Sequence, residues 1–135
     1  MRVVLDTNVL VSGVFFGGLP GRILEAWKEN KLTFVVSPAI LEEYFRVGRV
    51  LATKYQGVEL DPILALVVMH ADIIDTPIIS EGVCEDPDDD KFLTCAVAGG
   101  ASIVVSGDKH LCTVSGWQGV DVMTPKAFVE RYLER

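Results

Sequence analysis

The stretch Arg2-Val3-Val4-Leu5-Asp6-Thr7-Asn8 decides the fold, because a short apolar strand runs directly into a dense polar cluster. Adjacent valines followed by a leucine are typical of a central strand that is buried on both faces. Such strands form open parallel sheets, whose ligands bind at the carboxyl ends of the strands. Asp6, which follows this strand directly, is therefore the first candidate for a functional residue.

Strands and helices alternate along the remaining chain. Glycine and proline at 17–21 predict a loop, and no linker, repeat or low-complexity segment interrupts the pattern. Further strands are expected at 33–36, 73–74, 102–105 and 120–123, and helices at 22–30, 38–53, 61–70, 86–99, 108–111 and 124–133. This order predicts the α/β class, with helices on both faces of a parallel sheet. The 135 residues form a single domain, 1–135, that is large enough to bury a core.

The charge balance restricts the possible partners. The net charge is −7, whereas passive binding of nucleic acid depends mainly on Lys and Arg. Five of the acids fall within the six residues 85–90. A bound divalent cation would reverse the local field where these acids meet others. The composition thus argues against passive RNA binding but permits RNA chemistry that depends on a metal.

Three features of the sequence predict a cytoplasmic protein without a membrane segment. The longest apolar run, 63–74, contains His70 and Asp72 and is too short to cross a bilayer. At the N-terminus, Asp6 and Asn8 interrupt the apolar stretch that an export signal needs. The three cysteines form no C-x-x-C pair, which favours reduced thiols that act as small apolar fillers. They are Cys84, Cys95 and Cys112.

Two acids are placed at strand ends by simple counting. Asp6 follows the first strand directly, and Asp108 follows the strand at 102–105 after the two residues Ser106 and Gly107. Both therefore belong at the carboxyl edge of the predicted sheet. The alternative for each is that its carboxylate only caps the helix that follows, which Asp does well.

Glu43 and Glu42 occupy different positions on the helix predicted at 38–53. At about 100° per residue, Glu42 points into solvent, while Glu43 lies at the margin of the apolar face. A carboxylate at that margin is partly dehydrated, which is costly unless a cation or donor meets it. The alternative is a surface salt bridge with Lys54 or Arg46.

The acidic run ends in a residue that helix capping does not explain. Asp86 is a good N-cap before Pro87, and Asp88 and Asp89 suit the positive end of the helix dipole. Asp90 lies on the same helical face as the apolar residues that follow and is expected to point inward.

Four carboxylates from separate segments can therefore meet at one end of the sheet. Like charges that approach closely repel one another and need a cation between them. Oxygen ligands without Cys or His select a hard ion, Mg²⁺ or Mn²⁺. The predicted metal-binding residues are Asp6, Glu43, Asp90 and Asp108.

With these four segments in place, the chain resembles the PIN (PilT N-terminus) domain, and more closely the small prokaryotic PIN proteins classed as toxins of toxin–antitoxin pairs. The similarity covers essentially the whole chain, with the motifs in the family's order. The matching stretches are Leu5-Asp6-Thr7-Asn8-Val9-Leu10-Val11-Ser12, Ser37-Pro38-Ala39-Ile40-Leu41-Glu42-Glu43-Tyr44, Asp86-Pro87-Asp88-Asp89-Asp90-Lys91-Phe92-Leu93 and Ser106-Gly107-Asp108-Lys109-His110-Leu111.

The resemblance implies a three-layer α/β/α fold with a central five-stranded parallel sheet, a homodimer, a cognate antitoxin and cleavage of single-stranded RNA. Asp6, Glu43, Asp90 and Asp108 match the metal-binding acids of the family. Tyr44 departs from the Leu-like residue that usually follows the glutamate, which concerns packing more than chemistry. Accessory polar positions are matched by Asn8 and Ser106, and Asp86 or Asp89 is expected to support the metal from further out.

RNA binding would need basic residues near these acids. Arg46 and Arg49 lie three residues apart on the helix that carries Glu43, and Lys109 is adjacent to Asp108. The alternative for this strip is a set of solvated charges that balance neighbouring acids.

The sequence therefore predicts a Mg²⁺- or Mn²⁺-dependent endoribonuclease that hydrolyses phosphodiester bonds and acts as a toxin. The first alternative is a catalytically silent PIN-like module that binds RNA or protein. A phosphatase of the haloacid-dehalogenase type is the second, but it needs an Asp two residues after its nucleophile, where this chain has Asn8.

Overall fold

A computed structural model describes residues 1–75, 83–84 and 86–134. Its centre is a five-stranded sheet in the order β3-β2-β1-β4-β5, in which every neighbouring pair is parallel. The strands are β1 (Arg2–Leu5), β2 (Thr33–Val36), β3 (Asp72–Ile73), β4 (Ile103–Val105) and β5 (Asp121–Met123). The α/β class and the five strands predicted from the sequence are confirmed.

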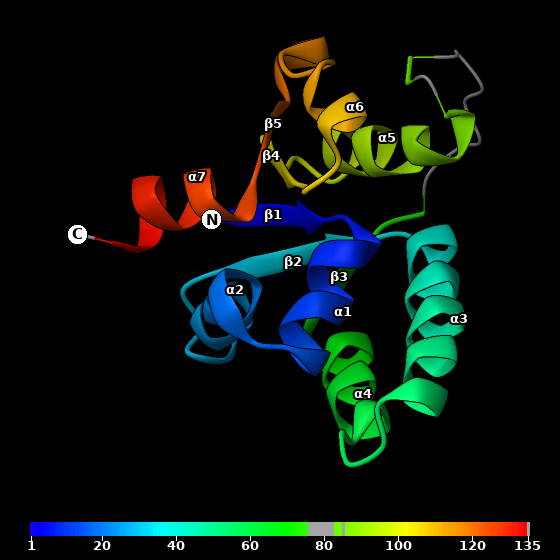
Figure 1. The fold of residues 1–135 in the computed structure, drawn as a ribbon. Coiled ribbons are helices and arrows are strands. Elements are labelled where there is room, and N and C mark those ends of the chain that lie inside the picture. Colours follow the sequence, from blue (N-terminus) through cyan, green and yellow to red (C-terminus); the bar gives the residue numbers. More distant parts are fainter. Residues whose placement is uncertain (76–82, 85, 135) are drawn as a thin grey trace.

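Helices cover both faces of this sheet, so the fold has three layers. Figure 1 shows α1 to α4 gathered on one side and α5 and α6 on the other, while α7 packs against α2. The helices are α1 (Thr7–Phe15), α2 (Gly18–Lys28), α3 (Pro38–Lys54), α4 (Leu60–His70), α5 (Asp90–Ala98), α6 (Lys109–Cys112) and α7 (Pro125–Phe128), with the short turns η1 (Pro87–Asp89), η2 (Trp117–Gly119) and η3 (Val129–Leu133).

The strand order reverses at the pair β1 and β4. The chain moves outward from β1 to β2 and β3, returns through α5 to β4, and then moves outward the other way to β5. The register sets Leu5 beside Val105, so the residues that follow these two strands are neighbours although about one hundred positions separate them. Ligands of open parallel sheets bind at such a reversal.

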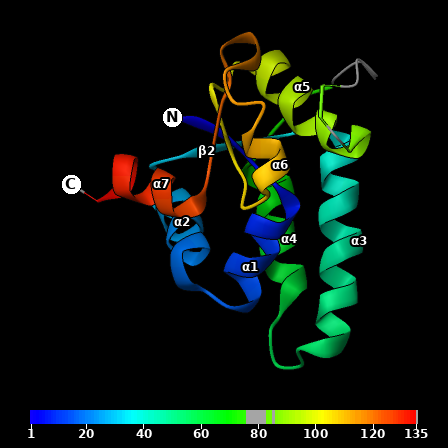
Figure 2. The same cartoon turned by 45° about the horizontal axis from the view of Figure 1, so that its top comes forward.

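The carboxyl edge of the sheet also receives the beginnings of two helices. In Figures 1 and 2 the first turns of α3 and α5 lie side by side at this edge, and contacts between the two helices agree with both views. The fold therefore delivers four chain segments to one place: the ends of β1 and β4 and the starts of α3 and α5.

The loop expected at 17–21 is wrong, because α2 already begins at Gly18. Proline is tolerated at Pro20, since the first N–H groups of a helix have no partner within it. The turn before α2 is made by Gly17 and Gly18, with φ of 74° and 62°. A Cβ on Gly13 would lie 2.7 Å from Leu24 Cδ1, so this glycine permits the close approach of α1 and α2.

The core is built around strands that are buried on both faces. Val3, Val4 and Leu5 of β1 are all at most 1% exposed, as a sheet between two helical layers requires. Trp27 of α2 stacks on Phe34 of β2 at 4.9 Å between ring centroids. Among the described residues no single helix is long and apolar enough to span a bilayer; only α1 and α2 together, bent by 93°, reach that length and apolarity.

Candidate functional site

The buried polar side chains of the described residues all gather at the carboxyl edge of the sheet. Two directly follow β1, one directly follows β2, one directly follows β4, and one opens α5. They are Asp6, Thr7, Ser37, Ser106 and Asp90. Burial of polar groups is unfavourable unless each finds a partner. This concentration of buried polar side chains therefore makes the carboxyl edge the candidate functional site.

Asp6 is 6% exposed and is held by neutral donors. Its Oδ2 accepts a hydrogen bond of 2.6 Å from Ser106 Oγ, and the polar backbone N–H of Asn8 lies near the same carboxylate. Burial raises the pKa of Asp6, and repulsion from Glu43 and Asp108 raises it further, while the two donors lower it. The net rise shows that neutral hydrogen bonds do not offset dehydration and nearby negative charge.

Asp108 lies in the loop after β4, close to the same serine. Its backbone N–H donates to Ser106 Oγ at 3.0 Å, and its Oδ1 accepts from the backbone N–H of His110 at 2.8 Å. Asp108 therefore caps α6, as the capping alternative predicted, and its charge still reaches Asp6. Capping uses one carboxylate oxygen and does not remove Asp108 from the acidic edge.

Glu43 is half-buried on the first turns of α3, at the margin that its helical position predicts. Lys91 Nζ of α5 donates to its Oε1 at 2.6 Å, and the hydroxyl of Thr7 donates to its Oε2. Arg46, the expected salt-bridge partner, is more distant at 3.8 Å. The main cation of Glu43 thus comes from another helix, and both carboxylate oxygens have donors.

Asp90 points inward, as predicted, and is 4% exposed. Its Oδ1 accepts from the backbone N–H of Cys84 at 2.7 Å, and its Oδ2 accepts from that of Val83 at 3.3 Å. The carboxylate therefore holds the chain that enters the acidic run, and both of its oxygens are engaged by the backbone.

Asp89, next to Asp90 in the chain, lies within the electric field of the other acids. Burial raises the pKa of Asp89 to about 6, with further repulsion from Asp6, Asp86, Asp108 and Glu43. Asp86 is exposed and caps the turn η1 by accepting from the backbone N–H of Asp88 at 3.0 Å. A pocket of about 450 Å³ opens here and is lined by Asp86, Pro87, Asp89, Asp108 and His110.

The donor chemistry of this edge fits a hard divalent cation. Among the residues that the structure describes, no Lys or Arg lies within ion-pair distance of Asp6, Asp89 or Asp108. Carboxylate oxygens are the preferred ligands of Mg²⁺ and Mn²⁺. No three acids, histidines or cysteines within the described ranges converge closely enough to hold an ion, so coordination by three of them would require side-chain adjustment.

Three supporting residues were not identified from the sequence. Tyr44 is 2% exposed, and its hydroxyl donates to the Leu5 carbonyl at 2.5 Å, which fixes α3 to the end of β1 beside Asp6. Thr7 and Lys91 both hold Glu43. The polar tip on a residue of the buried face of α3 is the signal that could have identified Tyr44, since a buried Tyr hydroxyl needs a partner.

The residues predicted to bind RNA are all exposed, but their surroundings differ. Arg46 pairs with Glu42 at 3.2 Å and lies near Glu43. Arg49 lies one turn further along α3, with its guanidinium 5.5 Å from the centre of the Phe45 ring. The backbone of Lys109 follows Asp108 directly. Of the three, Arg46 and Lys109 are the closer to the acids.

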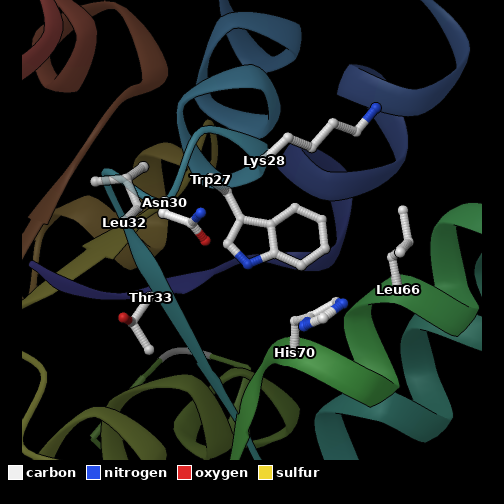
Figure 3. A pocket seen from close by; sticks show the side chains of 7 residues that line it. All are labelled: Trp27, Lys28, Asn30, Leu32, Thr33, Leu66 and His70. Carbon is white, nitrogen blue, oxygen red and sulfur yellow. The ribbon is translucent and has the colours of Figure 1, made fainter.

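A larger pocket, of about 580 Å³, lies near the opposite edge of the sheet and contains none of the predicted site residues. Figure 3 shows the indole of Trp27 projecting into it opposite His70, while the ammonium of Lys28 points away. The lining residues are Trp27, Lys28, Asn30, Leu32, Thr33, Leu66 and His70. The larger pocket and the cluster of acidic residues therefore lie at different ends of the molecule.

Two solved structures have the same fold at low sequence identity. One is VapBC2 from Rickettsia felis bound to a DNA fragment from their promoter, with a TM-score of 0.59 and 17% identity over 92% of this chain and 98% of that chain. The other is PAE2754 from Pyrobaculum aerophilum, with a TM-score of 0.59 and 14% identity over 99% of this chain and 90% of that chain. These similarities concern the fold.

Sequence comparison reaches further. An uncharacterized protein of Methanocaldococcus jannaschii is 33% identical over 98% of this chain and 92% of its own length. A family model described as the PIN domain matches residues 2–110, which include all four predicted acids. The chain therefore belongs to the PIN-domain family.

Proposed function

We propose that this protein is a ribonuclease that uses Mg²⁺ or Mn²⁺ to hydrolyse phosphodiester bonds of single-stranded RNA. The observation that carries the proposal is the group of acids at the carboxyl edge. Burial and mutual repulsion raise the pKa values of Asp6 and Asp89, and no described Lys or Arg pairs with them. A divalent cation would relieve this repulsion. Membership of the PIN family, which is typically a nuclease family, supports the same function.

The contacts refine which acids would hold the ion. The sequence favours Asp6 and Asp90 as primary ligands, with Glu43 and Asp108 completing the site. In the structure both oxygens of Asp90 and both of Glu43 accept from the protein. No Lys or Arg of the described residues pairs with Asp6, Asp89 or Asp108. We therefore assign the ion to Asp6, Asp89 and Asp108 and give Asp90 the task of fixing the acidic run.

The chain's own groups supply orientation and charge. Ser106 fixes Asp6 and the backbone of Asp108 through one hydroxyl, which keeps the ends of β1 and β4 together. When bound, a dication of this kind activates water and neutralises charge that develops on the phosphate. Arg46 and Lys109 would contact flanking phosphates of the RNA, where exposed basic groups contribute affinity without reading sequence.

A toxin role and a cognate antitoxin are part of the same proposal. The chain shares its fold with VapBC2. Its four motif stretches, which carry Asp6, Glu43, Asp90 and Asp108, resemble those of the PIN-domain toxins. Binding of an antitoxin and formation of a homodimer would both be measured on purified protein, by size-exclusion chromatography with light scattering, with and without the product of a neighbouring gene.

The testing experiment combines metal binding with RNA cleavage. Wild-type protein should gain thermal stability with Mn²⁺ and cleave single-stranded RNA to products with 5′-phosphate ends, and EDTA should abolish both effects. Asp6→Asn should cleave RNA at least about a hundredfold more slowly than wild type, because the Asp6 carboxylate would both position the ion and balance its charge. His70→Ala, at the other pocket, is the matched control and should cleave like wild type. Full cleavage by Asp6→Asn, or cleavage in EDTA, would contradict the proposal.

The alternative is a PIN module that binds but does not cut. The observation in its favour is that no three acids, histidines or cysteines of the described residues converge on one point. The same titration distinguishes the two, because a silent module should gain no stability from Mn²⁺ at concentrations that saturate a metal site.

A further inference from the structure

Lys91 makes the most deeply placed ion pair of the described residues. Its side chain is 16% exposed and that of its partner Glu43 is 13% exposed, whereas every other described ion pair has at least one side chain that is more than a third exposed. Ion pairs in water contribute little, but dehydrated ones are strongly coupled. The pair joins α3 to α5 at the acidic edge, and its low exposure distinguishes it from the ion pairs on the surface.

The ammonium of Lys91 is fixed from two sides. It donates to Glu43 Oε1 at 2.6 Å and lies 3.2 Å from Asp88 Oδ2. Burial would lower the pKa of Lys91, but the hydrogen bonds and charges of Glu43 and Asp88 outweigh it and raise the pKa. The lysine therefore stays charged inside the acidic edge.

This contact divides the acids into two groups. Glu43 is satisfied without any metal, because Lys91 neutralises its charge and Thr7 donates to its second oxygen. No Lys or Arg of the described residues lies within ion-pair distance of Asp6 or Asp89. The fixed positive charge of Lys91 therefore reduces the net negative charge that is available to attract a divalent cation.

We propose that Lys91 is the internal counter-ion of Glu43, which withdraws this acid from metal binding and lowers the affinity of the edge for a divalent cation. This inference rests on the proposed metal-dependent function. It makes Lys91 a residue that tunes the metal site through charge, without itself touching the ion.

The charge effect has a predictable size. A fixed charge near the ion, in a medium of effective permittivity between those of protein and water, is expected to change the dissociation constant by about tenfold. An exposed charge at the same edge is screened by salt and should change it by no more than about twofold. Lys109, exposed and adjacent to Asp108, supplies that comparison within the same chain.

The experiment measures Mn²⁺ affinity by calorimetry for wild type, Lys91→Met and the matched control Lys109→Met. Lys91→Met should bind Mn²⁺ about tenfold more tightly than wild type, and Lys109→Met should stay within about twofold. Without metal, Lys91→Met should unfold at a lower temperature, because Glu43 keeps a half-buried charge without its cation. Equal or weaker Mn²⁺ binding by Lys91→Met would overturn the inference.

A second variant covers the case in which Lys91→Met does not fold. The double variant Glu43→Gln/Lys91→Met removes one charge of each sign and leaves no unpaired group, so it should fold and bind Mn²⁺ within about threefold of wild type. A large loss of Mn²⁺ binding in the double variant would show that Glu43 is itself a ligand, which overturns the inference. If wild type binds no Mn²⁺ at all, the proposed function fails together with it; if wild type binds and Asp6→Asn does not, the outcome at Lys91 bears on the inference alone.

Discussion

The two edges of the sheet handle charge in opposite ways. At the amino edge Arg2 donates to Asp72 at 2.6 Å and to the Gly99 carbonyl at 2.7 Å, so charge is balanced by a partner. At the carboxyl edge Asp6 and Asp89 have no described Lys or Arg partner, although the pocket there is smaller than the pocket beside Trp27. The difference teaches that acids without a cationic partner gather at the carboxyl edge, and this chemistry, not pocket volume, is the reason for proposing the site there.

The largest expected effect separates Asp90 from Asp89, which are adjacent in sequence. Asp90→Asn should lower the free energy of unfolding by about 2 to 3 kcal/mol, because an amide cannot accept from both Val83 and Cys84 N–H groups as a carboxylate does. Asp89→Asn should leave folding intact and weaken Mn²⁺ binding by at least about tenfold. Denaturant unfolding and calorimetry of the two variants check this, and the reverse pattern would return the ligand role to Asp90.

The next effect concerns pH in metal-free protein. The pKa of Asp89 is raised from 3.8 to about 6, so the folded state holds the proton more tightly than the unfolded one. Stability from this group is therefore present at low pH and is lost as the pH rises from about 4 through 6, by about 1 to 2 kcal/mol after allowance for solvent screening. Unfolding curves of wild type and Asp89→Asn across this range should differ by that amount, and parallel curves would contradict the environment described for Asp89.

A smaller effect tests the support beneath the acids. Tyr44→Phe removes the hydroxyl that donates to the Leu5 carbonyl and should lower the free energy of unfolding by about 1 kcal/mol. Because this bond fixes α3 beside Asp6, Mn²⁺ affinity should fall as well, though less than in Asp89→Asn. A variant with unchanged stability would show that water replaces the hydroxyl as the donor to the Leu5 carbonyl.

The smallest effect is expected at the balanced edge. Arg2→Met breaks the pair with Asp72, whose two side chains are 37% and 44% exposed, and should cost no more than about 1 kcal/mol of stability. Mn²⁺ binding should not change, since this pair lies at the opposite end of the strands. A loss of metal affinity in Arg2→Met would show that the two edges are coupled.

The sequence predicts the fold well where its pattern is local. Apolar runs gave five strands, and alternation with helices gave the parallel sheet. Helix α1 was not predicted, because its valines and Gly13 have low helix propensity and its packing against α2 decides the matter. Strand order depends on contacts between distant segments and came only with the structure.

Within the site, residues at strand ends were the most predictable. Asp6 and Asp108 follow from counting, and the margin position of Glu43 follows from the helical period. The relation of Asp89 to Asp90 did not follow, because the turn η1 winds more tightly than an α-helix and changes the direction of each side chain. The contact of Lys91 with Glu43 joins residues 48 positions apart, which no local pattern can reveal.

The pairing of β1 with β4 has a consequence for synthesis of the protein. Asp6 is translated about one hundred residues before its neighbour Ser106. Until β4 has left the ribosome, the nascent chain lacks the strand that completes the acidic edge. A chain with the proposed activity would therefore be unable to cut the RNA around it until β4 has been translated.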